Sequence, residues 1–435
     1  MGGHFYFGLT GQKDEKNDTI NISMKREFIP LLLLTFVNTL NFSILIPILP
    51  FIIKAYGGGT VMYGVILSTY PFFQFFAAPI LGTLSDRYGR RPILLISQTG
   101  TMLSWVIFAL SYFVPHITIG MISIPVVVIM LARIADGITG GNNAVANAYL
   151  SDITTHEEKT KTFGLMGGVV GLGLIVGPVI GGLTMSSSLG YLAPILLTLA
   201  ISIATLIIMV KYLPESLPVE KRASFVKMSW IKELQFLPKI KKYSKNRQIK
   251  YLFFLRGMFL FVLNSFSSIF VLFLIDTFAF DSAKVGLLFV VIGVFLIINQ
   301  TLVTSWLSKR IGDLKTFVLG QMALVVSQLL FVFVSNFILF LPLIYLNNFG
   351  ISVSMPTFKS LISKAVDKSK QGEIMGIDES FSSASAAIAP LIATWFYAVI
   401  GKYVFVLQAL MLLVSIVFFE AKRGWKKTTY STPQE

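Results

Sequence analysis

Gly82-Thr83-Leu84-Ser85-Asp86-Arg87-Tyr88-Gly89-Arg90-Arg91-Pro92 is a short charged stretch between two long apolar runs, 61–81 and 92–114. Each run has the roughly 20 residues that an apolar helix needs to cross a bilayer, so the charged stretch is expected at a membrane surface. The arginines alone would be typical of any cytoplasmic loop, because cytoplasmic loops of membrane proteins are enriched in Lys and Arg. The glycines at both ends predict a tight turn between helices. Asp86 precedes Arg90 by four residues, within reach if the turn is helical.

The composition indicates a polytopic membrane protein. The 435 residues are 54% hydrophobic and 13% charged, whereas a soluble domain carries about 25% charged residues. The net charge of +15 does not indicate a nucleic-acid partner, because the basic residues gather in alternate loops, as membrane orientation requires. With no cysteine and three scattered histidines, we expect no disulfide, metal site or cofactor.

The apolar pattern predicts an all-α membrane protein with both chain ends in the cytoplasm. The polar N-terminal stretch lacks the pattern of a signal peptide. Most loops on one side are rich in Lys and Arg, whereas the loops on the other side hold only Lys54, Lys284 and Lys402; the basic side is the inner one. We expect twelve spans, at 28–53, 61–82, 92–114, 121–148, 162–185, 190–212, 250–275, 284–306, 315–335, 337–358, 373–398 and 402–420.

The spans fall into two sets of six. We expect a cytoplasmic tail (1–27), a first half (28–213), a cytoplasmic linker (214–249), a second half (250–421) and a second tail (422–435). The linker is rich in lysine and contains Pro214 and Pro218. Its segment 225–237 fits either a basic amphipathic helix on the inner leaflet or a solvated linker, and the sequence leaves both open.

The two halves repeat each other in sequence. The segment 151–164 recurs 212 positions later at 363–376, and Pro178 meets Pro390 at the same offset. The charged stretch recurs weakly at 306–313, where Leu307 stands 223 positions after Leu84 and Lys309 replaces the acid. In transporters built from such repeats, the transport site lies between the repeats near the midplane of the membrane.

Three spans carry motifs at membrane depth. Pro47 and Pro50 are expected to bend or break the first span. Arg133 and Asp136, three residues apart, share one face of the fourth span, and charges at this depth face a bundle interior or a watery cavity. They form either a structural ion pair or a proton or substrate site. Glycines four residues apart in the fifth span predict close helix packing: Gly173, Gly177 and Gly181.

These motifs resemble those of a known family. The charged stretch resembles the loop-2/3 signature of the major facilitator superfamily, G-x-L-x-D-R-x-G-R-R, at every named position. The Pro47/Pro50 spacing resembles that of twelve-span drug:proton antiporters. The region 133–182 and the segment 371–376 are similar to the tetracycline:proton antiporter group, and 173–182 resembles the antiporter motif: Gly173, Gly177, Pro178, Gly181 and Gly182. The resemblance implies twelve transmembrane helices in two pseudo-symmetric six-helix halves that move by alternating access.

The resemblance also implies roles for individual residues. Asp152 would pair with Arg90, and Asp86 would lie near the start of the eleventh span, around Gly372, where a helix dipole favours an anion. The implied cytoplasmic gate comprises Gly82, Asp86, Arg87, Gly89, Arg90, Arg91 and Asp152. Spans one, four, seven and ten would line the cavity, which gives the substrate candidates Asn38, Asn41, Asn142, Asn143, Asn264, Asn347 and Asn348.

The chain departs from the tetracycline exporters at two acidic positions, where Asn38 and Leu324 stand. Because a neutral Asn cannot exchange a proton, another acid must couple transport to protons. Burial raises the pKa of a carboxyl, so buried acids can cycle protons. The candidates are Asp136 with Arg133, and Asp378 or Glu379 with Arg256. Asp378 and Glu379 are also consistent with a merely solvated, interfacial position.

We therefore predict a monomeric secondary active transporter in a lipid bilayer, such as the bacterial inner membrane. It would export a small amphipathic organic solute, a drug or metabolite, in exchange for protons. The alternatives are uptake or facilitated movement of a metabolite or siderophore-like solute, and a non-transporting membrane sensor. An enzyme is not expected, because the sequence holds no H-E-x-x-H, no G-x-S-x-G and no acid pair at catalytic spacing.

Overall fold

The computed structural model describes residues 28–120, 122–154, 159–222, 247–366 and 371–423. These residues form helices long and apolar enough for eleven membrane spans, the last of which is Ile377–Glu420. That stretch holds two helices, because Gly401 adopts a φ of 58° between them. Twelve spans result, and the predicted all-α membrane fold is confirmed. The predicted tail 1–27, residues 223–246 of the predicted linker 214–249 with its candidate surface helix at 225–237, and residues 424–435 lie outside the described residues.

The first set of six spans is built from eight helices, because two of its spans are broken. The helices α1 and α2 together form the first span, and α5 and α6 form the fourth. A short hairpin of β1 (Thr118–Ile119) and β2 (Ile122–Ser123) joins α4 to α5. The helices are α1 (Phe28–Ser43), α2 (Leu45–Ala55), α3 (Thr60–Tyr88), α4 (Arg90–Leu110), α5 (Ile124–Thr139), α6 (Asn143–Ile153), α7 (Lys159–Met185) and α8 (Leu192–Tyr212).

The second set follows a 3₁₀ turn, η1 (Val219–Lys221). Its first helix begins at Arg247, within the predicted linker. One span contains a π-helical turn, η2 (Asn299–Val303), between two α-helices. The elements are α11 (Arg247–Phe278), α12 (Ser282–Ile298), α13 (Thr304–Ile311), α14 (Asp313–Phe331), α15 (Phe337–Lys364), α16 (Gln371–Ile400), the 3₁₀ turn η4 (Gly401–Tyr403) and α17 (Val404–Arg423).

The charged stretch is not a turn with a glycine at each end, so that prediction is wrong for Gly82. Helix α3 continues through Gly82 to Tyr88, and a side chain at Gly82 would meet no atom within 4 Å. The chain reverses at Gly89, whose φ of 101° lies in the region that favours glycine. Gly312 repeats the arrangement between α13 and α14 with a φ of 80°.

Two helix breaks follow from local sequence. The first span breaks between Ser43 and Leu45, because Pro47 cannot donate to the carbonyl four residues earlier, that of Ser43. The fourth span, predicted as continuous, breaks at Gly140. Gln74 of α3 donates to the freed Gly140 carbonyl at 2.9 Å. Backbone groups at membrane depth need such partners.

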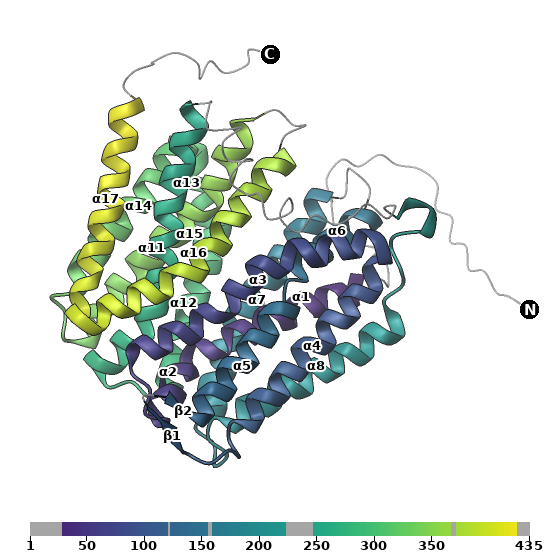
Figure 1. Ribbon diagram of the computed structural model, residues 1–435. Coiled ribbons are helices and arrows are strands. Elements are labelled where there is room, and N and C mark those ends of the chain that lie inside the picture. The colour runs from purple at the N-terminus through teal and green to yellow at the C-terminus, as the bar shows by residue number, and fades with distance from the viewer. Residues whose placement is uncertain (1–27, 121, 155–158, 223–246, 367–370, 424–435) are drawn as a thin grey trace, which may run out of the picture.

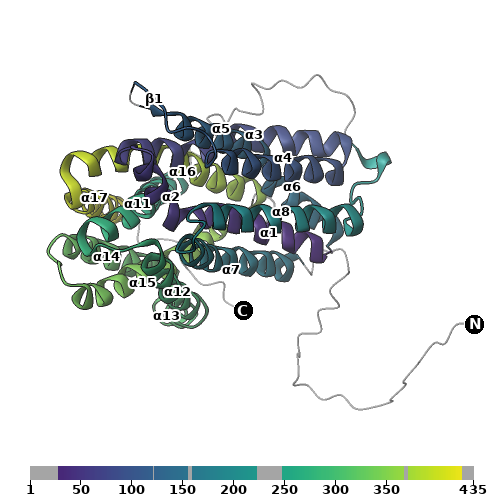
Figure 2. The same cartoon turned by 90° about the horizontal axis from the view of Figure 1, so that it is seen from below.

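The two sets of helices lie side by side and diverge toward one end of the molecule (Figure 1). We call the end that carries β1 and β2 the hairpin end, and the end where α3 meets α4 the Gly89 end. The sets meet toward the hairpin end, where α3 packs on α16 and α7 on α12 (Figure 2). There Gly64 lies against Thr394, and Gly182 against Gly286. Glycine thus brings the helices of the two sets close together.

Candidate functional site

A buried ion pair lies inside the first half. Arg133 Nη1 stands 2.9 Å from Asp136 Oδ2 on α5, and the two residues are 3% and 5% exposed. The Arg133 guanidinium lies 4.6 Å from the centre of the Tyr70 ring. Asp136 comes 12 residues after Ile124, the start of the span, which places it about 18 Å along the helix and so near mid-membrane.

A second buried ion pair joins α11 and α16 in the other half. Arg256 Nε and Nη2 donate to the two oxygens of Asp378 at 2.7 and 3.0 Å, and the guanidinium lies 4.8 Å from the Phe358 ring centre. The pairing expected for Arg256 is present, and Asp378 is buried rather than solvated. Asp378 comes seven residues after Gln371, about 10 Å from the start of the helix. The neighbouring Glu379 is exposed.

Charged residues also cluster at the Gly89 end. Arg90 Nε stands 3.0 Å from Asp152 Oδ2, which is the pairing expected from the sequence. Arg90 Nη1 also stands 2.5 Å from Asp86, whose side chain is more than half exposed. In this structure Asp86 has its partner Arg90 in its own half, at the end where the two halves diverge (Figure 1); its expected position near Gly372 stays a prediction. Arg87 occupies the last turn of α3.

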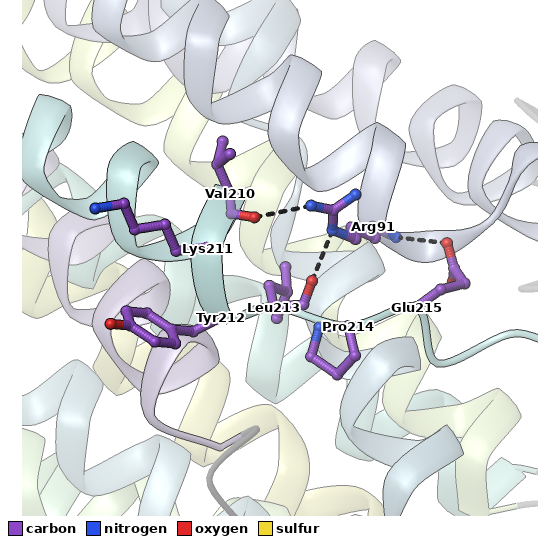
Figure 3. A pocket seen from close by; sticks show the side chains of 7 residues that line it. All are labelled: Arg91, Val210, Lys211, Tyr212, Leu213, Pro214 and Glu215. Carbon is purple, nitrogen blue, oxygen red and sulfur yellow. Dashed lines mark hydrogen bonds between the residues drawn. The ribbon is translucent and has the colours of Figure 1, made fainter.

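Glu215 caps the start of α4 (Figure 3). The sequence did not predict this role. The Glu215 carboxylate accepts from the backbone N–H of Arg90 and of Arg91, at 2.8 and 3.2 Å. The N–H groups of a first helical turn lack partners and favour an anion. The Arg91 guanidinium donates in turn to the carbonyls of Leu213 and Val210. These contacts line a surface hollow of about 630 Å³ and tie the chain after α8 to the charged stretch.

The second half carries a charge-reversed copy of this cluster. Asp313 follows Gly312 as Arg90 follows Gly89, and it accepts hydrogen bonds from Lys364 at 2.7 Å, Ser360 at 2.5 Å and Ser308. Arg90 likewise bonds to Ser85 at 2.7 Å. At the repeat offsets, the trio Ser85, Arg90 and Asp152 corresponds to Ser308, Asp313 and Lys364.

The glycines of α7 lie in contact with the broken first span. A side chain at Gly173 would come within 2.8 Å of Thr39, and one at Gly177 within 2.9 Å of the Ile44 backbone nitrogen. Gly181 faces the Ile44 carbonyl, and Gly182 faces Gly286 of the other half. The Pro178 carbonyl also packs on Gly286. The predicted close packing of this motif is therefore present.

The structure brings some of the predicted cavity residues together and separates others. Asn38 donates to Asn142 at 2.8 Å, and Asn41, three residues after Asn38, is buried. In the second half, Asn347 donates to Ser327 at 3.2 Å, and Asn348 donates to the Ile292 carbonyl at 3.0 Å. Asn264 bonds within its own helix, and Asn143 is exposed. Leu324 packs in the apolar core.

Twelve membrane spans in two sets, with polar and charged groups buried within each set, define a secondary transporter. The chain belongs to the major facilitator superfamily, whose family model matches residues 31–312 and 252–434. The predicted family is thus confirmed, and the protein is a multi-pass integral membrane transporter of small solutes.

The chain is similar to relatives that are resistance proteins by name. It is 31% identical to the class C tetracycline resistance protein of Escherichia coli over 77% of this chain and 80% of that protein. It is 24% identical to multidrug resistance protein 2 of Bacillus subtilis (strain 168), over 90% and 94% of the two chains.

Solved structures share the fold. The human organic anion transporter MFSD10 superposes with a TM-score of 0.67 at 22% identity, over 91% of this chain and 99% of that one. A bacterial homologue of the lysosomal transporter Spinster, in an inward-facing and unoccupied conformation, superposes with a TM-score of 0.70 at 12% identity, over 93% and 100%.

Proposed function

We propose that this protein exports a small amphipathic organic compound in exchange for protons, by alternating access across a bacterial inner membrane. The observation that carries the proposal is the Arg133–Asp136 pair, an acid buried near mid-membrane beside one guanidinium nitrogen and the hydroxyls of Thr101 and Ser104. Relatives named for resistance to tetracycline and to multiple drugs support export. The apolar and aromatic side chains of the spans suit an amphipathic organic solute.

Asp136 fits the role of coupling acid better than Asp378 does. A proton on Asp136 would neutralise its charge and release Arg133, which is then free to change partners. Asp378 is held by two hydrogen bonds and links α11 to α16, so its protonation would cost both contacts. It also lies about 10 Å from one end of its helix rather than near the middle. We assign the Arg256–Asp378 pair a structural role.

The Gly89 end is the cytoplasmic side in this proposal, because the loops at that end carry most of the Lys and Arg residues. Both chain ends would then be cytoplasmic, and the conformation described would face inward. Closure of the Gly89 end would bring Asp86 toward the start of α16. Arg90 and Asp152 would hold the α3–α4 turn in shape during that movement.

Reconstituted protein tests the proposal. Proteoliposomes carrying a pH gradient are assayed with tetracycline and a panel of amphipathic antibiotics and dyes. We expect gradient-driven flux of at least one compound, and loss of the pH dependence in Asp136→Asn. Glu220→Gln, which changes an exposed acid outside the membrane spans, serves as the matched control. Flux that ignores the gradient would favour facilitated movement, and coupled flux in Asp136→Asn would exclude Asp136 as the coupling acid.

A further inference from the structure

A small cavity lies in the second half, toward the hairpin end. It has a volume of about 130 Å³ and is enclosed by α11, α12, α14 and α15. Its walls carry four aromatic rings, those of Phe266, Phe270, Phe289 and Phe331, together with two carboxamides. Phe331 is the last residue of α14, and Phe289 lies two turns from the start of α12. The cavity therefore lies about two helical turns from the hairpin end of these helices.

The size and chemistry of the lining limit what fits. An apolar cavity of about 150 Å³ in another protein binds benzene, so this cavity has room for one six-membered ring. Its described lining holds no charged side chain, and an ionised group would lose its hydration there without compensation. Aromatic walls favour an aromatic occupant, through offset or edge-to-face contacts.

Asn347 supplies a directional contact. Its side-chain nitrogen donates to Ser327, but within the described part of the chain nothing donates to its side-chain oxygen. The residue is only 3% exposed, yet its side-chain oxygen is not one of the fully enclosed unpaired atoms, so an occupant of the cavity that Asn347 lines can reach it. Asn348 differs, because its side chain already bonds to the Ile292 carbonyl and to Ser352. The Asn347 oxygen is therefore the acceptor available to an occupant.

The first half closes the cavity. Ile46 of α2 lines it and packs against the apolar core of the second half. At the lining position Ser267 the side chain is exposed, so the cavity has an opening there. Because Ile46 and the phenylalanines belong to different halves, separation of the halves at the hairpin end would uncover the cavity.

We propose that this cavity binds one uncharged aromatic ring of the transported compound. An N–H or O–H on the ring donates to the Asn347 oxygen, and Ile46 covers the ring until the halves separate at the hairpin end. The inference rests on the proposed function for the compound that carries the ring. Binding of the ring itself needs neither a gradient nor transport. The binding inference and the proposed export function can therefore fail separately.

The absence of cysteine from the chain makes a chemical test simple. Ser267→Cys places a unique thiol at the opening, and its rate of alkylation by N-ethylmaleimide is measured on purified protein. The probe is benzamide, which has one ring, N–H donors and no charge. We expect benzamide to slow alkylation saturably and acetamide, which lacks the ring, to have no effect. Adding Asn347→Leu should raise the half-protecting concentration about 2- to 13-fold, the value of one hydrogen bond.

Two further variants make the result decisive. Gln408→Leu removes a buried carboxamide of α17 that does not line the cavity, and protection should be unchanged. Ile351→Phe fills part of the cavity and should abolish protection in protein that remains monodisperse. Absence of protection by benzamide, equal protection by acetamide, or indifference to Asn347→Leu would each overturn the inference, even if proton-driven export is established. Saturable protection without any coupled export would refute only the proposed function.

Discussion

The Arg256–Asp378 pair gives a prediction with a magnitude. Asp378→Leu removes both acceptors, at 2.7 and 3.0 Å, from a guanidinium that is 2% exposed. A hydrogen bond to a charged group contributes about 1.5–3 kcal/mol, so the two bonds amount to roughly 3–6 kcal/mol. That agrees with the 3–5 kcal/mol or so lost when one partner of a buried ion pair is removed. We expect the free energy of unfolding to fall by about 3–5 kcal/mol.

The double variant Arg256→Met/Asp378→Leu should behave differently. It removes both charges and fills similar volume, and such replacements are often neutral or stabilising. Equilibrium unfolding of the purified protein, followed by tryptophan fluorescence, measures all variants of the cycle. If the double variant loses as much free energy as the two single variants combined, the pair does not act as a coupled unit and the reasoning fails.

The same double variant also tests the assignment of roles. A structural pair can be replaced by apolar residues without changing the chemistry of transport, so proton-driven flux should persist when the double variant is reconstituted. Asp136→Asn should lose that coupling while remaining folded. The opposite pattern, with coupling lost in a folded double variant and kept in Asp136→Asn, would move the coupling role to Asp378.

Three further predictions concern the ends and contacts of helices. Gly177→Ala should destabilise the protein by about 1–3 kcal/mol through overpacking against Ile44, whereas Gly171→Ala, with no atom within 4 Å, should keep or raise its thermal stability, because alanine favours a helix over glycine. Glu215→Ala should cost about 0.5–2 kcal/mol in denaturant unfolding, as loss of a helix cap does, and equal stability of Glu215→Ala and Glu215→Gln would contradict the cap. In a double-mutant cycle, Asp313 and Lys364 should couple by less than about 1 kcal/mol because Lys364 is exposed, and 1 M salt should reduce that coupling; a larger, salt-independent coupling would oppose this.

Much of the fold could be predicted from the sequence, because a membrane span is a local property of apolar length. The buried pair of Arg256 was also foreseeable, since a charge at membrane depth needs a partner. The Gly82 turn was mispredicted because an isolated glycine does not end a helix when the next residues continue it. The helix at Gly82 ends only where Gly89 takes a positive φ.

Other features depended on distant partners. Glu215 caps a helix that begins 125 residues earlier, and nothing local to Pro214 and Glu215 signals that role. The Asp313–Lys364 pair was not predicted, because the second half keeps the geometry of the first but reverses the charges. A comparison of residue identities therefore finds only a weak repeat at these positions. The unpartnered Asn347 oxygen, too, is visible only after the helices are packed.

The ion pairs described above each join two side chains of the same half, whereas the halves touch through Gly64 on Thr394 and Gly182 on Gly286. A rigid rotation of one half against the other would therefore break none of these salt bridges. At these two described contacts, the energy barrier to that rotation would come from parting closely packed, uncharged surfaces. The rate of exchange between the two orientations should then respond to bilayer lateral pressure and temperature far more than to ionic strength.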